Sequence, residues 1–129
     1  MAKSVLLVED EDSIAIALEF LMQRDGYQIR RVTNGPAALE AVAEETPDLV
    51  LLDISLPGAS GYEVCQKIRL DPALAGVKIL MMTATGGDIP RRKSLDMGAD
   101  AFITKPFSMA ALTGEVRRLI GEEEAAPDV

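Results

Sequence analysis

The feature that most constrains the fold is a run of four apolar residues that leads directly into a carboxylate, Leu49-Val50-Leu51-Leu52-Asp53. A continuous apolar run of this length is typical of a strand buried on both faces, as in a parallel sheet with helices on each side. Asp53 would then stand at the carboxyl end of that strand. Ligands bind at this edge of open α/β sheets, whereas an isolated Asp after a strand more often begins a turn.

Four other strand-like runs alternate with helical patterns along the chain. They cover residues 5–8, 28–32, 78–82 and 101–104, and the weak run at 28–32 is expected at or near an edge of the sheet. Apolar residues at helical spacing follow each run. This alternation predicts an α/β fold with a parallel, doubly wound sheet and right-handed crossovers.

The first helix of this pattern has a well-defined expected position. Asp12 or Ser13 is the expected N-cap, and Gly26 is expected to end the helix. Its apolar spacing of i, i+3, i+4 and i+7 predicts one stripe that faces the core. That stripe consists of Ile14, Ala17, Leu18 and Leu21.

Composition and length exclude several classes of protein. The net charge is −8, from 13 basic and 21 acidic residues, and binding to a phosphate backbone requires clustered Lys and Arg, so no direct nucleic-acid contact is expected. No apolar run reaches the roughly 18 to 20 residues that span a bilayer. The apolar run near the N-terminus is too short for a signal peptide. The single cysteine, Cys65, suits a reducing compartment. We therefore expect a cytoplasmic protein without membrane insertion.

The polar residues at the strand ends form a chemically coherent set. Glu9 and Asp10 follow the first strand, Asp53 the third, Thr83 the fourth and Lys105 the fifth. Two like charges ~4 Å apart repel by roughly 4 kcal/mol at an effective dielectric near 20, so the carboxylates need a cation, and Mg²⁺ prefers such oxygen ligands. A carboxylate nucleophile could then accept a phosphoryl group, with a lysine and a hydroxyl to bind its oxygens.

Each of these residues also has a plain structural explanation. Thr83 could form a turn, Lys105 could be a surface charge, and acids such as Glu9 and Asp10 are favoured in the first turn of a helix by its dipole. Taken singly, each structural explanation is the more common one. Their joint occurrence at the strand ends favours a phosphotransfer site.

These motifs resemble the receiver domains of two-component response regulators, the chemotaxis-regulator fold. The resemblance covers residues 3 to 121 and implies a flavodoxin-like (βα)5 sheet with strand order 2-1-3-4-5. Residues 1–121 would form the receiver domain, and residues 122–129 an acidic tail or the stub of a linker. The matching motifs are Val8-Glu9-Asp10, Leu52-Asp53 with Pro57-Gly58 and Gly61, Thr83-Ala84, and Lys105-Pro106-Phe107.

The resemblance also implies the role of each site residue. Asp53 would be the phosphoacceptor, and Lys105 and Thr83 would bind the phosphoryl group. The Mg²⁺ ligands would be the carboxylates of Asp10 and Asp53 and the backbone carbonyl of Ser55, with Glu9 acting mainly through water. The Lys105-Pro106 peptide would be cis, an isomer that proline makes accessible.

A conformational switch is a further implication of the resemblance. Thr83 would move toward the phosphate, and Phe102, where many members carry Tyr, would turn inward. The segment with Gly86, Gly87 and Pro90 is expected to be mobile. Output would pass through the surface of the fourth helix, fifth strand and fifth helix, which could also form a homodimer.

The implied function is a phosphorylation-activated signalling switch that catalyses only its own phosphotransfer and autodephosphorylation. A sensor histidine kinase or a histidine phosphotransfer protein would supply the phosphoryl group, and a downstream protein or an effector domain would read the result. The chain cannot be a histidine phosphotransfer protein itself, because it contains no His.

Three other readings compete with this one. A metal-dependent phosphatase with an Asp nucleophile, of the haloacid-dehalogenase type, would need a second Asp where Ser55 stands. A dinucleotide-binding domain would need a glycine-rich turn after the first strand, where the acids at 9–12 would repel a pyrophosphate. A docking module that is not phosphorylated should have lost some of the site residues, and none is lost.

Overall fold

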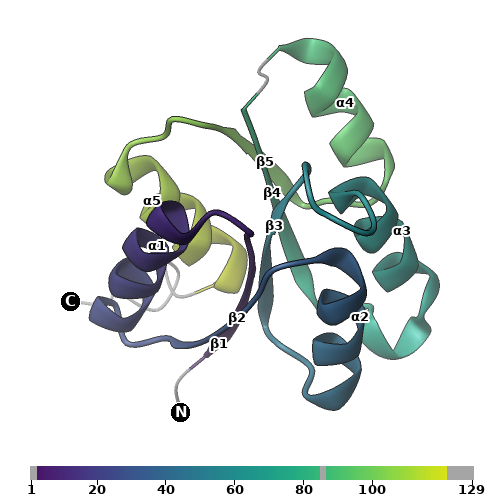
Figure 1. The fold of residues 1–129 in the computed structure, drawn as a ribbon, viewed down its shortest axis with the longest axis horizontal. Coiled ribbons are helices and arrows are strands. Elements are labelled where there is room, and N and C mark those ends of the chain that lie inside the picture. The colour runs from purple at the N-terminus through teal and green to yellow at the C-terminus, as the bar shows by residue number, and fades with distance from the viewer. Residues whose placement is uncertain (1–2, 85–86, 122–129) are drawn as a thin grey trace.

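The computed structural model describes residues 3–84 and 87–121, and within these ranges five parallel strands alternate with helices (Figure 1). The sheet order is β2-β1-β3-β4-β5, which confirms the predicted fold. The predicted tail at 122–129 and Gly86 of the glycine-rich segment lie outside the described residues. The elements are β1 Ser4–Val8, α1 Asp12–Arg24, β2 Gln28–Val32, α2 Gly35–Glu44, β3 Leu49–Asp53, α3 Gly61–Leu70, the 3₁₀ turn η1 Pro72–Leu74, β4 Lys78–Thr83, α4 Asp88–Asp96, β5 Ala101–Thr104 and α5 Met109–Ile120.

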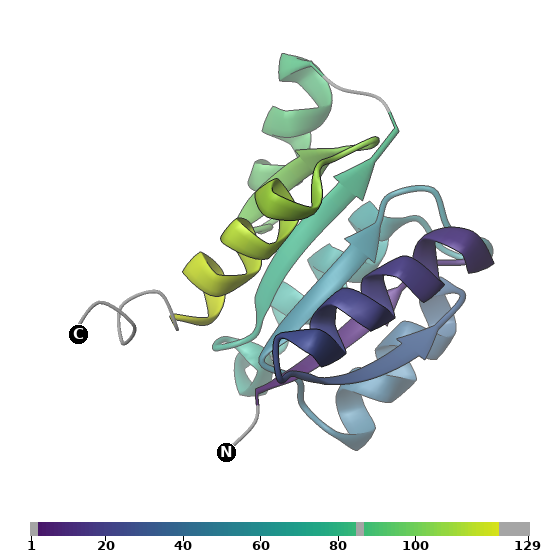
Figure 2. The same cartoon turned by 90° about the vertical axis from the view of Figure 1, so that its left-hand side faces the viewer.

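Helices cover both faces of the sheet. In Figures 1 and 2, α1 and α5 lie on one face, and α2, α3 and α4 lie on the other. Successive strand residues point to opposite faces, so β3 sends Leu49 and Leu51 toward the first layer and Val50 and Leu52 toward the second. Every residue of β3 is buried, which explains why this strand is apolar throughout.

Strands β2 and β5 form the two edges of the sheet. The residues of β2 are exposed or only partly buried, as expected for the weakest of the predicted strands. β1 and β4 both pair with β3, so the central strand is held on both sides by main-chain hydrogen bonds. No helix in the described ranges is long and apolar enough to cross a membrane.

Helix α1 differs from its prediction in two respects. It begins at Asp12 with Glu11 as N-cap, so neither predicted cap residue is correct, and the Glu11 side chain makes no capping hydrogen bond. Ala17 is exposed, while Ala15 is fully buried. Residues 14–18 are all apolar, so their spacing does not decide which side of the helix faces the sheet. The buried residues are Ala15, Leu18, Leu21 and Met22.

Candidate functional site

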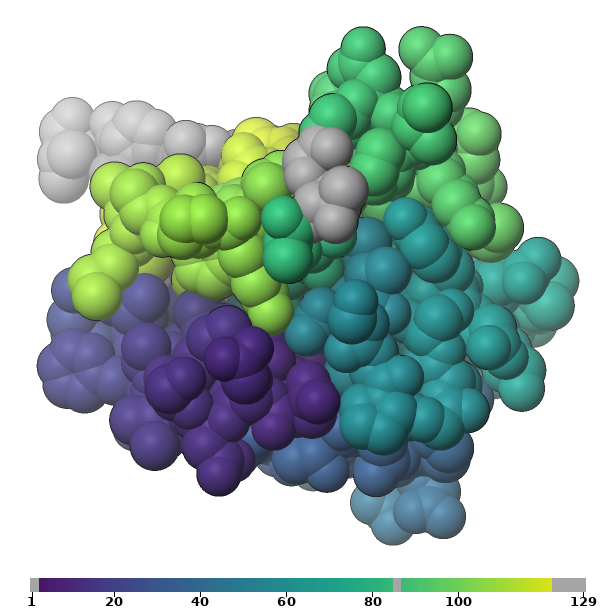
Figure 3. Space-filling view, turned by 45° about the horizontal axis from the view of Figure 1, so that its top comes forward, coloured from purple at the N-terminus to yellow at the C-terminus, as the bar shows by residue number. Residues whose placement is uncertain are grey.

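The predicted site residues gather at the carboxyl edge of the sheet. Figure 3 shows the start of α1 in purple, the segment after β5 in lime green and the loop after β3 in teal, which meet on one face of the molecule. Parallel pairing brings the ends of β1, β3 and β4 into line, with Val8 opposite Leu52 and Asp53 opposite Met82. The residues that follow these positions therefore become neighbours in space.

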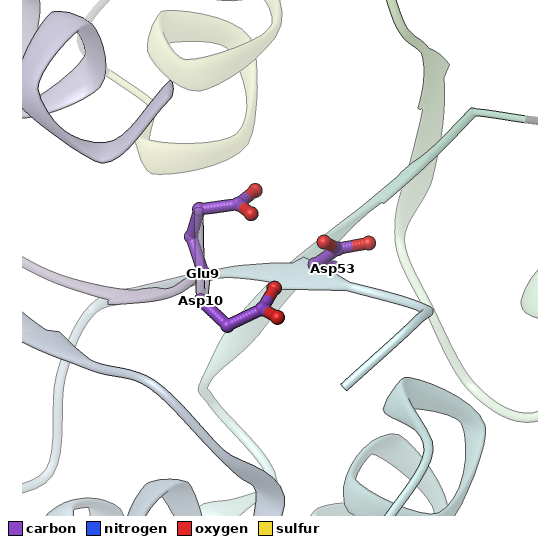
Figure 4. A group of neighbouring side chains, drawn as sticks. All are labelled: Glu9, Asp10 and Asp53. Atoms are coloured by element: carbon purple, nitrogen blue, oxygen red, sulfur yellow. The ribbon is translucent and has the colours of Figure 1, made fainter. Parts of the chain in front are cut away.

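Three carboxylates form the centre of the site. Glu9, Asp10 and Asp53 each offer an oxygen within 4.8 Å of those of the other two, and Figure 4 shows the side chains around a shared space. Glu9 is 0% exposed and Asp53 is 5% exposed, whereas Asp10 is exposed to solvent. The cluster is thus buried on one side and open at Asp10.

Lys105 balances part of this negative charge. Its Nζ donates to Glu9 Oε1 at 2.9 Å and to Asp53 Oδ2 at 3.2 Å. Burial by itself lowers the pKa of Lys105, but the hydrogen bond to Glu9 and the charges of Asp53 and Glu9 outweigh it and raise the pKa above its usual range. The ammonium group is therefore protonated at neutral pH and joins the two buried acids.

The pKa of Glu9 is also raised, but burial is the main cause. Burial raises its pKa most and the nearby charge of Asp53 raises it further, while the hydrogen bonds from Lys105 and from the Glu11 amide lower it. The net pKa is above the usual value for glutamate. The Glu11 N–H donates to Glu9 Oε2 at 3.1 Å, so both carboxylate oxygens are hydrogen-bonded.

Asp53 is held at the end of β3 through both of its oxygens. Oδ1 accepts from the Ser55 amide at 3.1 Å, and Oδ2 accepts from Lys105. The carbonyl of Ile54 accepts from the Gly61 amide at 2.8 Å, which brings the start of α3 against the strand end. A side chain at Gly61 would overlap the Asp53 carbonyl oxygen. The Ser55 carbonyl stays a predicted metal ligand.

Thr83 and the segment after β5 complete the edge. Thr83 is 6% exposed at the end of β4, and its carbonyl accepts from the Lys105 amide at 2.6 Å. The Lys105-Pro106 peptide is cis, as predicted. Phe102 is partly buried on β5 and packs against the second of the two buried clusters, which contains Val50, Leu52 and Met81.

The residues at this edge fit a divalent cation. Glu9, Asp10 and Asp53 supply oxygen ligands from two different segments, and hard cations such as Mg²⁺ bind carboxylates, carbonyls and water rather than nitrogen or sulfur. The accessible acid, Asp10, leaves room for retained waters or a phosphate oxygen. Lys105 alone neutralises one of the three negative charges, so a further cation would be electrostatically favoured.

Arg31, which no sequence motif indicates, reaches the same edge from β2. Its Nε donates to the Glu9 carbonyl at 3.0 Å. The strand pattern places Arg31 only on one face of an edge strand. Knowledge of the register, which sets Leu7 opposite Arg31, would be needed to predict this contact.

The fold and the acidic edge together define an α/β protein whose site suits phosphoryl transfer to a carboxylate. The sequence matches the response regulator receiver domain family over residues 5–117. The chain therefore belongs to this family of signalling modules, as its motifs predicted.

Sensory transduction proteins are similar to this chain over 91% of its length. Sensory transduction protein RegX3 of Mycobacterium bovis is 42% identical over 117 residues, which cover 91% of this chain and 50% of that protein. RegX3 of Mycolicibacterium smegmatis is 40% identical over the same share of each chain. The chain thus spans about half the length of these relatives.

Two solved structures show the same architecture. The receiver domain of sensor histidine kinase PA1611 from Pseudomonas aeruginosa, which has a magnesium ion coordinated in its active-site cleft, superposes with a TM-score of 0.86 at 29% identity, covering 94% of this chain and 99% of that one. A response regulator receiver domain protein from Methanospirillum hungatei gives a TM-score of 0.87 at 27% identity, covering 97% and 98%.

Proposed function

We propose that this protein is a phosphorylation-activated switch in which Asp53 accepts a phosphoryl group from a phosphohistidine. The observation that carries the proposal is the position of Asp53, fixed at the end of a fully buried strand between an acidic pair and Lys105. An Asp53 carboxylate oxygen would attack the phosphorus and form an acyl phosphate, while the P–N bond breaks and its electron pair leaves with the donor imidazole.

The surrounding side chains would divide the remaining work. Lys105 would bind one phosphoryl oxygen as a point charge, and the Thr83 hydroxyl would donate to another. Asp10, Asp53 and the Ser55 carbonyl would hold Mg²⁺, with Glu9 acting through water. When bound, the ion would neutralise charge on the transferring group. Positioning and charge stabilisation then suffice, without a general acid or base.

An apolar groove of about 480 Å³ opens beside Lys105, between α1 and α5. The groove reaches Lys105, whose Nζ lies 3.2 Å from Asp53 Oδ2, so a protein donor bound there by apolar contacts would bring its phosphohistidine close to Asp53. We propose that the groove docks a sensor histidine kinase or a histidine phosphotransfer protein. It is lined by Ile14, Ala17, Leu21, Pro106, Phe107 and Met109.

Output would pass through α4, β5 and α5. A hollow of about 570 Å³ on this face is lined by Phe102 together with charges of both signs, including Arg91 and Glu115. Movement of Thr83 and of Phe102 would alter this surface, which a downstream protein, an effector domain or a second copy would read. Retention of phosphate-dependent partner binding by Phe102→Ala would rule out aromatic gating.

We also propose that residues 1–121 form the receiver domain and that the protein is located in the cytoplasm.

Intact-mass measurement after incubation with Mg²⁺ and acetyl phosphate tests the proposal. Wild type should gain the mass of one phosphoryl group, and Asp53→Ala should gain none. Asp96→Asn, an exposed acid on α4, is the matched control and should be labelled normally. Unlabelled wild type, or undiminished labelling of Asp53→Ala, would refute phosphorylation at Asp53. A chelator should abolish labelling, and an unchanged rate would refute the metal role.

A further inference from the structure

Arg31 joins the two ends of the acidic turn between β1 and α1. Its Nε donates to the Glu9 carbonyl at 3.0 Å, and its Nη2 lies 3.0 Å from Asp12 Oδ1. The side chain of Arg31 is 19% exposed. The main chain of β2 adds a second tie, because the Glu9 amide donates to the Val32 carbonyl at 3.1 Å. Since Glu9 and Asp12 flank Asp10 in sequence, β2 constrains the turn that carries Asp10.

Asp10 depends on this turn more than the other two acids do. The Glu9 and Asp53 side chains are each held by Lys105 and by a backbone amide. Asp10 is the exposed member of the cluster. The side chain of Asp12 is 82% exposed, and its carboxylate forms an ion pair with Arg31. Asp12 is not a member of the cluster of three acids.

We propose that Arg31 is a positioning residue for divalent-cation binding, acting by holding Asp10 toward Asp53. The inference rests on the proposed function, since it takes Asp10 as a ligand of the ion. Arg31 acts through the turn and does not contact the reacting atoms. Its positive charge alone would weaken the binding of a nearby cation. A positioning role therefore predicts weaker cation binding when Arg31 is removed, whereas an effect of its charge alone predicts tighter binding.

Calorimetric titration with Mg²⁺ alone, without phosphodonor, separates these effects. Arg31→Ala should weaken Mg²⁺ binding by roughly 10-fold, as loss of a group that orients a metal ligand commonly does. Arg31→Lys keeps the charge but lacks the planar guanidinium, whose Nε bonds the Glu9 carbonyl while Nη2 forms an ion pair with Asp12, so it should also weaken binding. Arg30→Ala is the matched control, because Arg30 carries the same charge but donates to the carbonyls of Ala41 in α2 and of Glu45, which caps that helix. It should bind Mg²⁺ like wild type.

Unchanged or tighter binding by Arg31→Ala would overturn the inference, as would equal weakening by Arg30→Ala. A wild type that fails to bind Mg²⁺ would overturn both this inference and the metal role in the proposed function. A wild type that binds, with Arg31→Ala unaffected, would overturn this inference alone. If circular dichroism shows that Arg31→Ala is unfolded, Arg31→Gln replaces it in the titration. Arg31→Gln should also bind Mg²⁺ more weakly than wild type, and unchanged or tighter binding would overturn the inference.

Labelling by acetyl phosphate gives a second readout. The Mg²⁺ concentration for half-maximal rate should rise in Arg31→Ala by the same roughly 10-fold factor, while the rate at saturating Mg²⁺ should match wild type. A variant that merely loses stability would not combine a higher half-maximal Mg²⁺ concentration with an unchanged rate at saturating Mg²⁺. A reduced rate at saturating Mg²⁺ with an unchanged half-maximal concentration would contradict a positioning role toward the cation.

Discussion

At the level of single residues, Lys105 holds two buried carboxylates together. Lys105→Met should lower the free energy of unfolding by about 3 kcal/mol, because removing one partner leaves a buried charge uncompensated. The loss should be larger at pH 8 than at pH 5, since Glu9, whose pKa is already raised by burial, can take up a proton at the lower pH. Denaturant titration at both pH values measures this effect.

The matched control for Lys105 is Lys78→Met, which removes an exposed lysine at the start of β4. Its free energy of unfolding should stay close to that of wild type. An equal loss in both variants would show that the ion pairs of Lys105 add nothing to stability beyond an ordinary surface charge.

Cys65 is buried, and its thiol lies 3.4 Å from the Met97 carbonyl, to which it donates. Burial raises the pKa of Cys65 from 9.0 to about 11. The folded state therefore binds the thiol proton more tightly than the unfolded state does. The stability gained from this tighter binding is complete below pH 9 and is lost as the pH rises to about 11. The stability advantage of wild type over Cys65→Ala should shrink by roughly 2 to 3 kcal/mol across that range. A constant difference in denaturant titrations would contradict this.

At the level of elements, glycines in two helices should respond oppositely to substitution. Gly61 begins α3 against the backbone of Asp53, whereas a side chain at Gly114 in α5 would meet nothing within 4 Å. Gly61→Ala should destabilise by about 1 to 3 kcal/mol and slow labelling, because it displaces the end of β3. Gly114→Ala should stabilise by roughly 0.5 to 1 kcal/mol without affecting labelling. Thermal unfolding and intact-mass kinetics measure both effects, and normal labelling of a folded Gly61→Ala would contradict the first.

At the level of the whole molecule, the first and last helices lie side by side and form the groove beside Lys105. Ala17→Arg adds a long side chain at an exposed position of this groove. It should block labelling by a phosphorylated histidine kinase that labels wild type, but leave labelling by acetyl phosphate unchanged, since a small donor needs no docking surface. Leu70→Arg, at a 75% exposed position of α3, is the control. Equal transfer from the kinase to both variants would rule the groove out as a docking site.

Local pattern alone was sufficient for the sheet and for the composition of its edge. Short apolar runs that end in polar residues identify central strands, and parallel strands bring their carboxyl ends to one side whatever their order. Asp53, Thr83 and Lys105 could therefore be placed together before their distances were known. Their residue types then indicated phosphoryl transfer to a carboxylate.

Only the tertiary structure decided how far each site residue is buried and which groups it contacts. Ala15 rather than Ala17 faces the sheet, because apolar residues surround this part of α1 and the neighbouring elements select the buried side. Glu9 and Lys105 are 96 residues apart, so no local pattern could predict their pairing. The contact from Arg31 depends on the register of an edge strand. Spacing along the chain determines which residues can share an edge, whereas burial and pairing arise from contacts between distant segments.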